Sequence, residues 1–449
     1  KVAQEKRRPM IDTPVTIIGG GLAGCEAAWQ LLKRGHTVHL YEMKPLRFSP
    51  AHTSERLAEL VCSNSFKSND PGSAPGILKN EMRRLDSLIL WAADQTSVAA
   101  GAALAVDRSD FSAQVEKRLL LQGKFSLSRI ELTSLPSGGP VIVATGPLTS
   151  DALAQSISDL LGNPYLYFYD AIAPIVEADS IDMKKVYWAS RYDKGTPDYL
   201  NCPLTENEYK DFRRELIAGE KVIPRDFEST KHFEGCLPIE VLAARGEETL
   251  AFGPLKPVGL VNPHTNAIPY AVVQLRRENL SAGLFNMVGF QTRLTWPEQK
   301  RIFRMIPGLE NAEFSRLGSI HRNTYIHSPS VLSPCLNLRT AREIFFAGQL
   351  TGVEGYMESV ATGLLAGLSA SFILENKQFI PPPPSTAMGA LVRYITSSER
   401  DSASFQPMNI NFGIIEQPVG KRTGKKERRL LVTDNAHSSF TSWMEKISA

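Results

Sequence analysis

Three glycines near the start of the chain have the spacing of a phosphate-binding turn. Gly19, Gly21 and Gly24 form the pattern G-x-G-x-x-G. In this pattern the first glycine allows a tight turn, the second lets the backbone approach a pyrophosphate, and the third lets a helix pack closely on the strand. Glu42 follows about 20 residues later, where a carboxylate can accept hydrogen bonds from an adenosine ribose. These residues predict a dinucleotide site and leave both NAD and FAD open.

A strand, a helix and a second strand must surround these glycines for the turn to bind a phosphate. Residues 15–18 are apolar and include β-branched side chains, which predicts a short buried strand. Residues 25–34 are rich in helix formers, and Gly35 is placed to end that helix. Residues 37–41 predict the second strand, which Glu42 closes. A pyrophosphate is therefore expected at the N-terminus of the helix, where unpaired N–H groups and the helix dipole favour an anion.

Two later segments predict further parts of the same domain. Residues 140–146 form an apolar strand that ends in glycine, and residues 343–367 predict a strand, a glycine turn and a helix of small residues. Between them, from residue 165 to about residue 315, strand-like segments alternate with polar loops and one charged helix. We therefore expect an α/β protein with a Rossmann-like dinucleotide-binding domain and an inserted α+β domain.

The expected domain boundaries follow these changes in pattern. Residues 11–164 and 319–396 are assigned to the two parts of the dinucleotide-binding domain, and residues 165–318 to an inserted substrate domain. Residues 397–449 are assigned to a C-terminal extension. Its basic run, residues 421–429, predicts a flexible tail.

The composition limits the classes of protein that fit. Of the 449 residues, 43% are hydrophobic and 22% are charged, which is typical of a soluble globular protein. No run of about 18 apolar residues and no signal-peptide pattern occurs, so we expect a cytoplasmic protein without membrane contact. The net charge is only +3, so any nucleic-acid contact needs local basic patches. The candidates are Arg83, Arg84, Lys256, Arg276, Arg277 and residues 421–429.

The cysteines predict thiols rather than disulfides or metal ligands. Five cysteines occur, at positions 25, 62, 202, 236 and 335, without a C-x-x-C pair. This odd number and spacing argue against a zinc site and a disulfide framework and fit a reducing cytosol. We expect no metal. Cys25 and Cys335 are interpreted as structural, and Cys202 is given no role.

Short motifs along nearly the whole sequence resemble one family. They run in order from about residue 14 to about residue 418, and the set is far more specific than the glycine motif alone. The set resembles the folate- and FAD-dependent tRNA (uracil-5-)-methyltransferases, the TrmFO family, which are glutathione-reductase-like flavoproteins related to the MnmG/GidA group. The motifs are GGGLAG (19–24), PAH (50–52), VCSNS (61–65), EMRR (81–84), ATGPLT (144–149), DYLNCP (198–203), FEGCLP (233–238), GPLKPVGL (253–260), GFQT (289–292), WPEQK (296–300), HRNTY (321–325) and GVEGY (352–356).

The resemblance implies an activity, its cofactors and a partner. A carbon of 5,10-methylenetetrahydrofolate is transferred to C5 of uridine 54 in the T-loop of tRNA, FAD and NAD(P)H supply electrons, and the product is 5-methyluridine. The inserted domain would then contact tRNA. The relative that modifies the tRNA wobble uridine is expected to carry a further C-terminal helical domain, for which this sequence is too short.

The implied chemistry needs a cysteine that can ionise. Uracil C5 is a poor nucleophile, and addition of a thiolate to C6 makes C5 enolate-like. The two cysteines that the family uses correspond to Cys62 and Cys236. We favour Cys236 as the C6 nucleophile, with Cys62 as a second thiol near the flavin or as general base. The reverse assignment stays open.

The resemblance also implies cofactor and substrate residues. The flavin end of FAD is expected at Gly146 and the 348–356 loop, in which Gln349 occupies the position where such loops usually have an acidic residue. Substrate contacts are expected from Asn64, Tyr356 and His321, which resembles the folate-stacking histidine of the family. The cofactor residues are Gly19, Gly20, Gly21, Leu22, Ala23, Gly24, Glu42, Lys44, Gly146, Gly348, Gly352 and Gly355.

Two other functions explain part of the sequence. A plain FAD- or NAD-dependent oxidoreductase that acts on a small molecule accounts for the glycines and Glu42, but it gives the two motif cysteines no task. A non-catalytic flavin-containing RNA-binding protein is the second alternative, and the presence of Cys62 and Cys236 argues against it.

Overall fold

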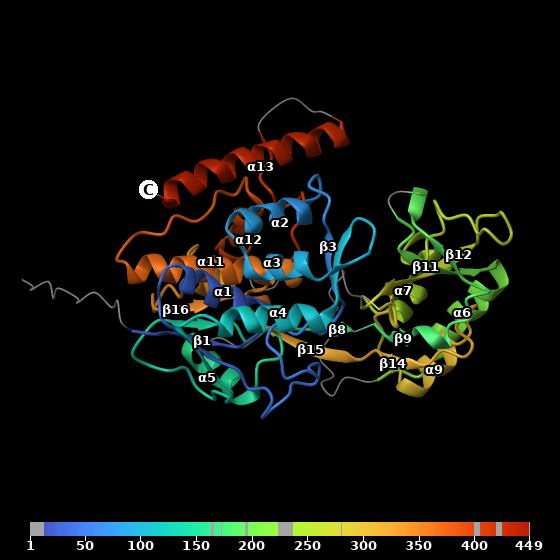
Figure 1. The fold of residues 1–449 in the computed structure, drawn as a ribbon, viewed down its shortest axis with the longest axis horizontal. Coiled ribbons are helices and arrows are strands. Elements are labelled where there is room, and N and C mark those ends of the chain that lie inside the picture. The colour runs from blue at the N-terminus through green and yellow to red at the C-terminus, as the bar shows by residue number, and fades with distance from the viewer. Residues whose placement is uncertain are drawn as a thin grey trace, which may run out of the picture.

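The protein has a larger and a smaller lobe, which are joined by a pair of strands (Figure 1). The computed structural model describes residues 13–162, 166–171, 173–193, 196–222, 237–279, 281–398, 405–418 and 424–448. Strands β8 (Leu166–Ala171) and β15 (Ile320–Tyr325) pair in antiparallel fashion where the chain passes between the lobes. The chain therefore enters the smaller lobe along one strand and returns along the other.

A parallel sheet of five strands forms the centre of the larger lobe. Its order is β16-β7-β1-β2-β6. The strands are β1 (Val15–Ile18), β2 (Val38–Tyr41), β6 (Phe125–Ser128), β7 (Val141–Val143) and β16 (Ile344–Phe346). All the pairs are parallel, so the turns that follow β1, β7 and β16 lie at one edge of the sheet although they are far apart in the sequence.

Two helices beside this sheet pack closely on each other because small residues line the contact between them. They are α1 (Leu22–Lys33) and α11 (Tyr356–Leu374). A Cβ atom added to Gly363 of α11 would lie 2.2 Å from the carbonyl oxygen of Ala23 in α1. Helix α11 is long and apolar enough to span a membrane, but 83% of its apolar window is buried inside the protein, as expected for a core helix.

Further helices and a small sheet complete the larger lobe. They are α2 (Ala74–Arg84), α3 (Leu88–Gln95), α4 (Arg108–Leu120), α5 (Asp151–Leu161), α10 (Ser328–Val331) and α12 (Ala387–Thr396), with the strands β3 (Ser65–Ser68), β4 (Ser97–Val98) and β5 (Ala103–Val106). Asp86, with φ of +56°, separates α2 from α3. Ser87 then caps α3 by accepting a hydrogen bond from the backbone N–H of Leu90.

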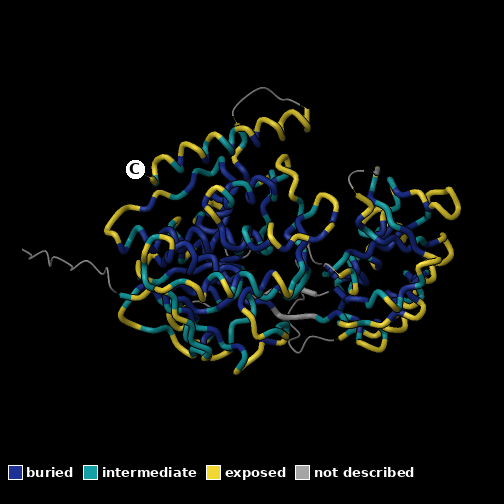
Figure 2. Tube along the Cα trace, viewed as in Figure 1, coloured by how far each residue is buried: buried dark blue, intermediate teal, exposed yellow. Residues whose placement is uncertain are grey.

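The smaller lobe is an antiparallel sheet with helices packed against it. The sheet order is β10-β11-β12-β13-β9-β14. The strands are β9 (Ile175–Glu177), β10 (Tyr187–Ala189), β11 (Tyr199–Leu204), β12 (Ala271–Arg277), β13 (Leu284–Met287) and β14 (Phe314–Arg316), and the helices are α6 (Glu206–Ala218), α7 (Ile239–Arg245), α8 (Thr249–Phe252) and α9 (Trp296–Phe303). This lobe buries a hydrophobic core of its own, separate from that of the larger lobe (Figure 2).

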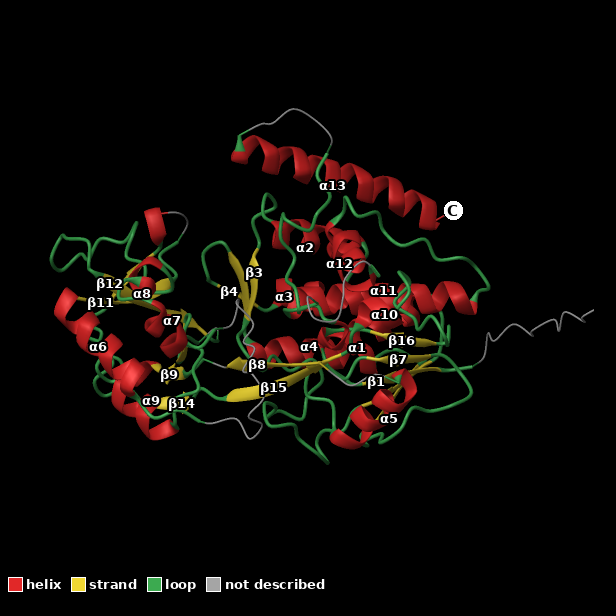
Figure 3. Cartoon of the chain, turned by 180° about the vertical axis from the view of Figure 1, so that it is seen from behind, coloured by secondary structure: helices red, strands yellow, loops and turns green. Residues whose placement is uncertain are grey.

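The C-terminal segment is a packed helix over residues 425–448. Helix α13 (Lys425–Ser448) lies over α2 and α12 (Figure 3). Val432, Ala436, Phe440 and Trp443 on one of its faces are buried, and Trp443 Nε1 donates to the carbonyl oxygen of Ile380 at 2.7 Å. The prediction of a flexible tail is therefore wrong for this segment. The basic residues stand only at the start of the helix, and the apolar face of its later turns packs against the larger lobe. Residues 419–423 of the tail lie outside the described residues.

A buried carboxylate supports the start of α12. Glu81 of α2 is 1% exposed, and its two carboxylate oxygens accept hydrogen bonds from the backbone N–H groups of Ala387 and Met388, each at 2.8 Å. These N–H groups have no partner inside their helix, and Glu81 satisfies them. Burial raises the pKa of Glu81 to about 8.

A pH dependence of stability follows from Glu81. The pKa of Glu81 in the folded protein lies above the ordinary value of 4.5, so the folded protein holds the Glu81 proton more tightly than the unfolded chain does. The resulting contribution to the free energy of unfolding is fully present below about pH 4.5 and is lost as the pH rises through about 8. We expect Glu81→Gln, which does not titrate, to show a flatter pH profile of unfolding free energy between about pH 5 and about pH 8. Urea unfolding at each pH measures the profile, and equal slopes in the two proteins would contradict the prediction.

Candidate active site

One cavity collects most of the predicted cofactor residues at the carboxyl edge of the parallel sheet. Its wall includes the turn after β1, the segment after β2, the segment after β7 and the turn after β16. Sequence positions more than 300 residues apart therefore share one site, as expected for parallel strands. The predicted residues in the wall are Gly19, Gly20, Gly21, Leu22, Ala23, Glu42, Lys44, Gly146, Gly348 and Tyr356.

The glycine turn is shaped to bind a phosphate. Gly19 has φ of +103°, and a Cβ atom on Gly24 would lie 1.9 Å from the Gly19 carbonyl oxygen, so both positions require glycine. Helix α1 begins at Leu22 with Gly21 as its N-cap and no side-chain cap, which leaves its first N–H groups available at the cavity. A Cβ atom on Gly21 would meet no atom within 4 Å. The space in front of Gly21 is thus open to a pyrophosphate.

Glu42 is fixed beside the glycine turn. It is 7% exposed, its Oε2 accepts from the backbone N–H of Gly20 at 2.8 Å, and its Oε1 accepts from the backbone N–H of Lys44 at 3.0 Å. These contacts hold the carboxylate at the end of β2 in the cavity wall, which is the place predicted for a ribose contact.

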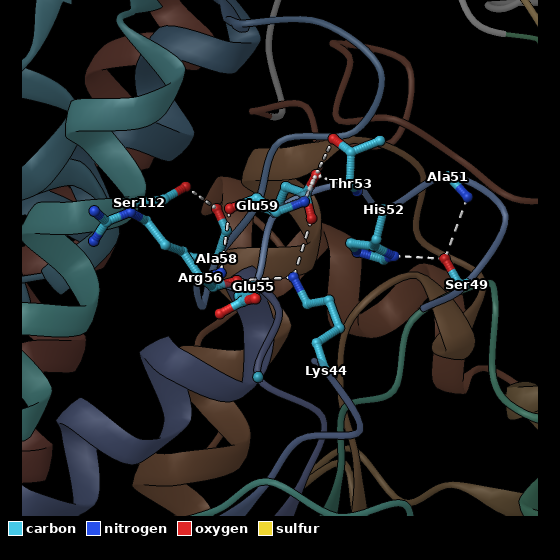
Figure 4. Close-up of polar contacts among 12 residues, drawn as sticks. Lys44, Ser49, Ala51, His52, Thr53, Glu55, Arg56, Ala58, Glu59 and Ser112 are labelled. Carbon is cyan, nitrogen blue, oxygen red and sulfur yellow. Dashed lines mark hydrogen bonds and ion pairs between the residues drawn. The ribbon is translucent and has the colours of Figure 1, made fainter. Parts of the chain in front are cut away.

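Polar contacts of Lys44 and His52 add residues that the sequence interpretation missed (Figure 4). Lys44 Nζ pairs with Glu59 Oε2 at 3.0 Å, and Ser49 Oγ is 2.5 Å from His52 Nδ1. His52 and Glu59 also line the cavity. Burial lowers the pKa of His52, and the neighbouring ammonium of Lys44 acts in the same direction. His52 lies within the PAH motif, which was the one signal that could have identified it.

The turn after β16 supplies the far end of the cavity. Gly348 and Gln349 line the cavity, and the Gln349 side-chain amide donates to the carboxylate of Glu354. Gly352 and Gly355 lie outside the cavity wall. A Cβ atom on Gly352 would lie 2.5 Å from the ring of Phe405, so this glycine permits close packing.

Cys62 lies directly behind the wall of the cavity. Its neighbour Val61 lines the cavity, and the hydroxyl oxygen of Tyr356 accepts from the backbone N–H groups of Cys62 at 2.7 Å and Ser63 at 3.2 Å. Tyr356 is also a wall residue and opens α11. One side chain therefore links the predicted cofactor site to the predicted catalytic cysteine.

The other predicted catalytic and substrate residues lie at different places. Cys236 is outside the described residues. His321 lies in β15, opposite Asp170 of β8 in the pairing register. Asn64 is fully buried, and its amide donates to the backbone carbonyl oxygens of Val106 and Arg277, each at 2.9 Å.

The three remaining described cysteines have thiols whose pKa is raised by burial. Cys25 and Cys202 are fully buried, and burial raises the pKa of each thiol far above its ordinary value. Burial also raises the pKa of Cys335. In the described part of the chain, no group of three or more His, Cys, Asp or Glu side chains is placed to hold a metal ion.

Several candidate tRNA cations make contacts within the protein. Arg83 pairs with Asp94 at 2.7 Å, and Arg84 reaches α13, where its guanidinium lies 5.1 Å from the ring centroid of Phe440. Arg277 lies over the ring of Trp188 at 4.7 Å, and Arg276 is 7% exposed. The sequence could not distinguish these buried or paired cations from exposed ones.

The fold and the cavity define a dinucleotide-binding α/β protein of the Rossmann type with an inserted α+β lobe. Residues 14–378 match the model of the family described as glucose inhibited division protein A. A crystal structure of GidA from Aquifex aeolicus is similar to this fold, with a TM-score of 0.71 and 18% sequence identity, over 98% of this chain and 74% of that chain. This likeness confirms the predicted fold class.

Curated relatives match at much higher sequence identity. The methylenetetrahydrofolate–tRNA-(uracil-5-)-methyltransferase TrmFO of Syntrophus aciditrophicus is 60% identical over 97% of this chain and 98% of its own length. The protein of the same name from Geobacter sulfurreducens is 55% identical over 96% of this chain and 99% of its own length. The chain therefore belongs to the TrmFO group of the glucose inhibited division protein A family, which confirms the resemblance found in the sequence.

Proposed function

We propose that this protein methylates C5 of a uridine in tRNA with 5,10-methylenetetrahydrofolate as carbon donor. Uridine 54 of the T-loop is the proposed target, FAD the resident cofactor and NAD(P)H the electron source, in the cytoplasm. The single observation that supports the proposal is that Tyr356, a residue of the cavity wall, accepts a hydrogen bond from the backbone N–H of Cys62. The names of the relatives support the same activity.

The residues of the cavity have the chemistry needed to hold FAD. The open space at Gly21, the available N–H groups of α1 and the fixed Glu42 suit the adenosine diphosphate half. Gly146, Gly348 and Tyr356 lie in the same wall and suit the flavin half. When bound, FAD would supply the redox chemistry of the carbon transfer.

The two motif cysteines have complementary roles in this proposal. The Cys236 thiolate adds to uracil C6: the S–C6 bond forms while the C5–C6 π electrons move towards O4, which makes C5 nucleophilic. After C5 has accepted the carbon, Cys62 takes the C5 proton. The electrons of the C5–H bond restore the double bond, and the Cys236 sulfur leaves C6.

The proposed division of the chain assigns the two substrates to different lobes. Residues 11–164 and 319–396 hold the cofactor, and residues 165–318 contact tRNA. His321 is proposed to stack on folate, since it lies in the strand that returns from the smaller lobe to the larger one. Because the target base belongs to a folded loop, it must be unstacked to reach the thiols.

A direct assay tests the proposed activity. The FAD-loaded protein is incubated with an unmodified tRNA transcript, 5,10-methylenetetrahydrofolate and NADPH, and the digested RNA is analysed for 5-methyluridine by mass spectrometry. We expect the product with the normal transcript and none when cytidine replaces uridine 54. If the protein oxidises NADPH without forming 5-methyluridine, the proposal fails and a small-molecule oxidoreductase becomes the better assignment.

A further inference from the structure

Two arginine side chains hold the backbone at Cys62 and at the two residues before it. Arg108, the first residue of α4, donates to the carbonyl oxygens of Leu60 and Cys62, the latter at 3.3 Å. Arg316, the last residue of β14, donates to the carbonyl oxygens of Val61 and Cys62, both at 2.9 Å. The carbonyl groups of three consecutive residues, the last of them Cys62, therefore accept hydrogen bonds from guanidinium groups, which fixes the backbone at the cysteine.

These contacts join the two lobes at the cysteine. Arg108 belongs to the larger lobe and pairs with Glu278, which directly follows β12 of the smaller lobe, at 2.6 Å. Arg276 of β12 donates through Nε to Asn64 Oδ1 at 3.1 Å. Arg316 also comes from the smaller lobe. The Cys62 segment is thus held from both sides of the boundary between the lobes.

Three arginine side chains interact electrostatically with Cys62. They are those of Arg108, Arg276 and Arg316, and each acts through its guanidinium group. Glu278 is the carboxylate that these three cations share among the described residues, and the uncharged Tyr356 hydroxyl faces the same group. Neighbouring cations stabilise a thiolate relative to a thiol.

Arg276 is buried and Arg108 and Arg316 are half-buried, and one carboxylate faces all three of them among the described residues. The Glu278 side chain is only 3% exposed, Arg276 is 7% exposed, and the Nε of Arg316 is buried with no hydrogen-bond partner among the described residues. A buried guanidinium group is costly unless an anion compensates its charge. One carboxylate cannot neutralise three cations, and a thiolate on Cys62 would supply the missing charge.

We propose that Arg108, Arg276 and Arg316 are positioning residues that hold Cys62 in place as a thiolate. The negative charge of Glu278 offsets part of the stabilisation that the three arginines give to this thiolate. The proposal rests on the role proposed above for Cys62 as the base that takes the C5 proton. The Cys62 proton passes to solvent before the reaction, so the sulfur is ready to accept a proton from C5. None of the three arginines needs to touch uracil, folate or flavin for this role.

The rate of alkylation by iodoacetamide tests the proposal, because the thiolate is the reactive form. The FAD-loaded protein is alkylated from about pH 5.5 to about pH 9.5, and the modification of the partly exposed Cys62 is followed by peptide mass spectrometry. For Arg316→Gln we expect the rate of Cys62 alkylation at pH 7 to be roughly tenfold lower. The midpoint of the plot of alkylation rate against pH should lie about one pH unit higher. Arg316→Lys, which keeps the charge, should recover most of the rate. Arg301→Gln, at an exposed ion pair on α9, is the matched control and should change nothing.

Glu278→Gln tests whether the arginines stabilise the Cys62 thiolate by their charge or only hold the Cys62 backbone in place. Removing the carboxylate raises the net positive charge, so we expect faster alkylation at pH 7 and a midpoint at lower pH, opposite to Arg316→Gln. If both substitutions shift the profile in the same direction, or if neither shifts it, the proposal is overturned. The measurement uses neither tRNA nor folate. A protein that fails to methylate tRNA but shows the opposite shifts would refute the proposed function and leave the thiolate assignment standing.

Discussion

Replacing Gly21 by valine should give a folded protein that cannot retain FAD. Gly21 has φ of −76° and ψ of −171°, a conformation open to any residue, and an added Cβ atom would meet no protein atom within 4 Å. The added side chain therefore leaves the fold unstrained and occupies the space through which a pyrophosphate must approach the backbone. The expected result is a loss of bound flavin of at least about tenfold, with little change in the melting temperature of the cofactor-free protein.

Flavin absorbance per protein measures the bound FAD, and thermal unfolding measures the melting temperature. Substitutions of two other glycines serve as controls. Gly123→Val places the same side chain at an exposed glycine with no atom within 4 Å, so flavin content should stay normal. Gly24→Val should instead prevent folding, because its Cβ atom would lie 1.9 Å from the Gly19 carbonyl oxygen. A Gly21→Val protein that purifies with a full complement of FAD would show that the pyrophosphate lies elsewhere.

The glycine turn could be predicted because its requirements are local. The strand β1, the helix α1 and Glu42 lie within 28 residues of one another, from Val15 to Glu42, and each step follows from neighbouring side chains. The turn after β16 was recognisable for the same reason, since small residues such as Gly363 mark a helix that packs closely on another element. Periodicity and glycine spacing therefore predicted many of the residues that form the wall of the cavity.

The C-terminal helix shows how a charged start can hide an amphipathic pattern. The basic run suggested a flexible tail, yet Val432, Ala436, Phe440 and Trp443 recur at spacings of three and four residues and are buried against the larger lobe. Charge near one end of a helix does not oppose folding when the remaining turns bury an apolar face. The signal was present in the sequence and was outweighed by composition.

The environment of Cys62 had no comparable signal in the sequence. Arg108 and Arg316 are separated from the cysteine by 46 and 254 residues, and each looks like an ordinary surface charge in its own segment. Their contacts depend on how the smaller lobe meets the larger one, which local pattern cannot specify. Arg276 was one of the candidates for contact with tRNA phosphates, whereas the structure buries it beside Asn64.

Removing either motif thiol should abolish methylation while FAD remains bound. Cys236→Ala loses the nucleophile and Cys62→Ala loses the base, and we expect each to lower the rate of 5-methyluridine formation by on the order of 10³-fold or more. Cys62 does not belong to the described wall of the cavity, and neither cysteine has a proposed role in holding FAD, so flavin content should be unchanged. Cys335→Ala is the control, because that cysteine lies in a different surface cavity, and its rate should stay normal.

A tRNA that contains 5-fluorouridine at position 54 assigns the two roles. Fluorine at C5 cannot leave as a proton, so the enzyme that has added to C6 stays linked to the RNA through its sulfur. We expect Cys62→Ala to form this covalent complex, since Cys236 is still present to attack, and Cys236→Ala to form none. The opposite pattern would exchange the two roles, and Cys62 would then be the nucleophile. In that case the arginines around Cys62 would activate the attacking sulfur instead of the base, because a thiolate is the reactive form in both roles.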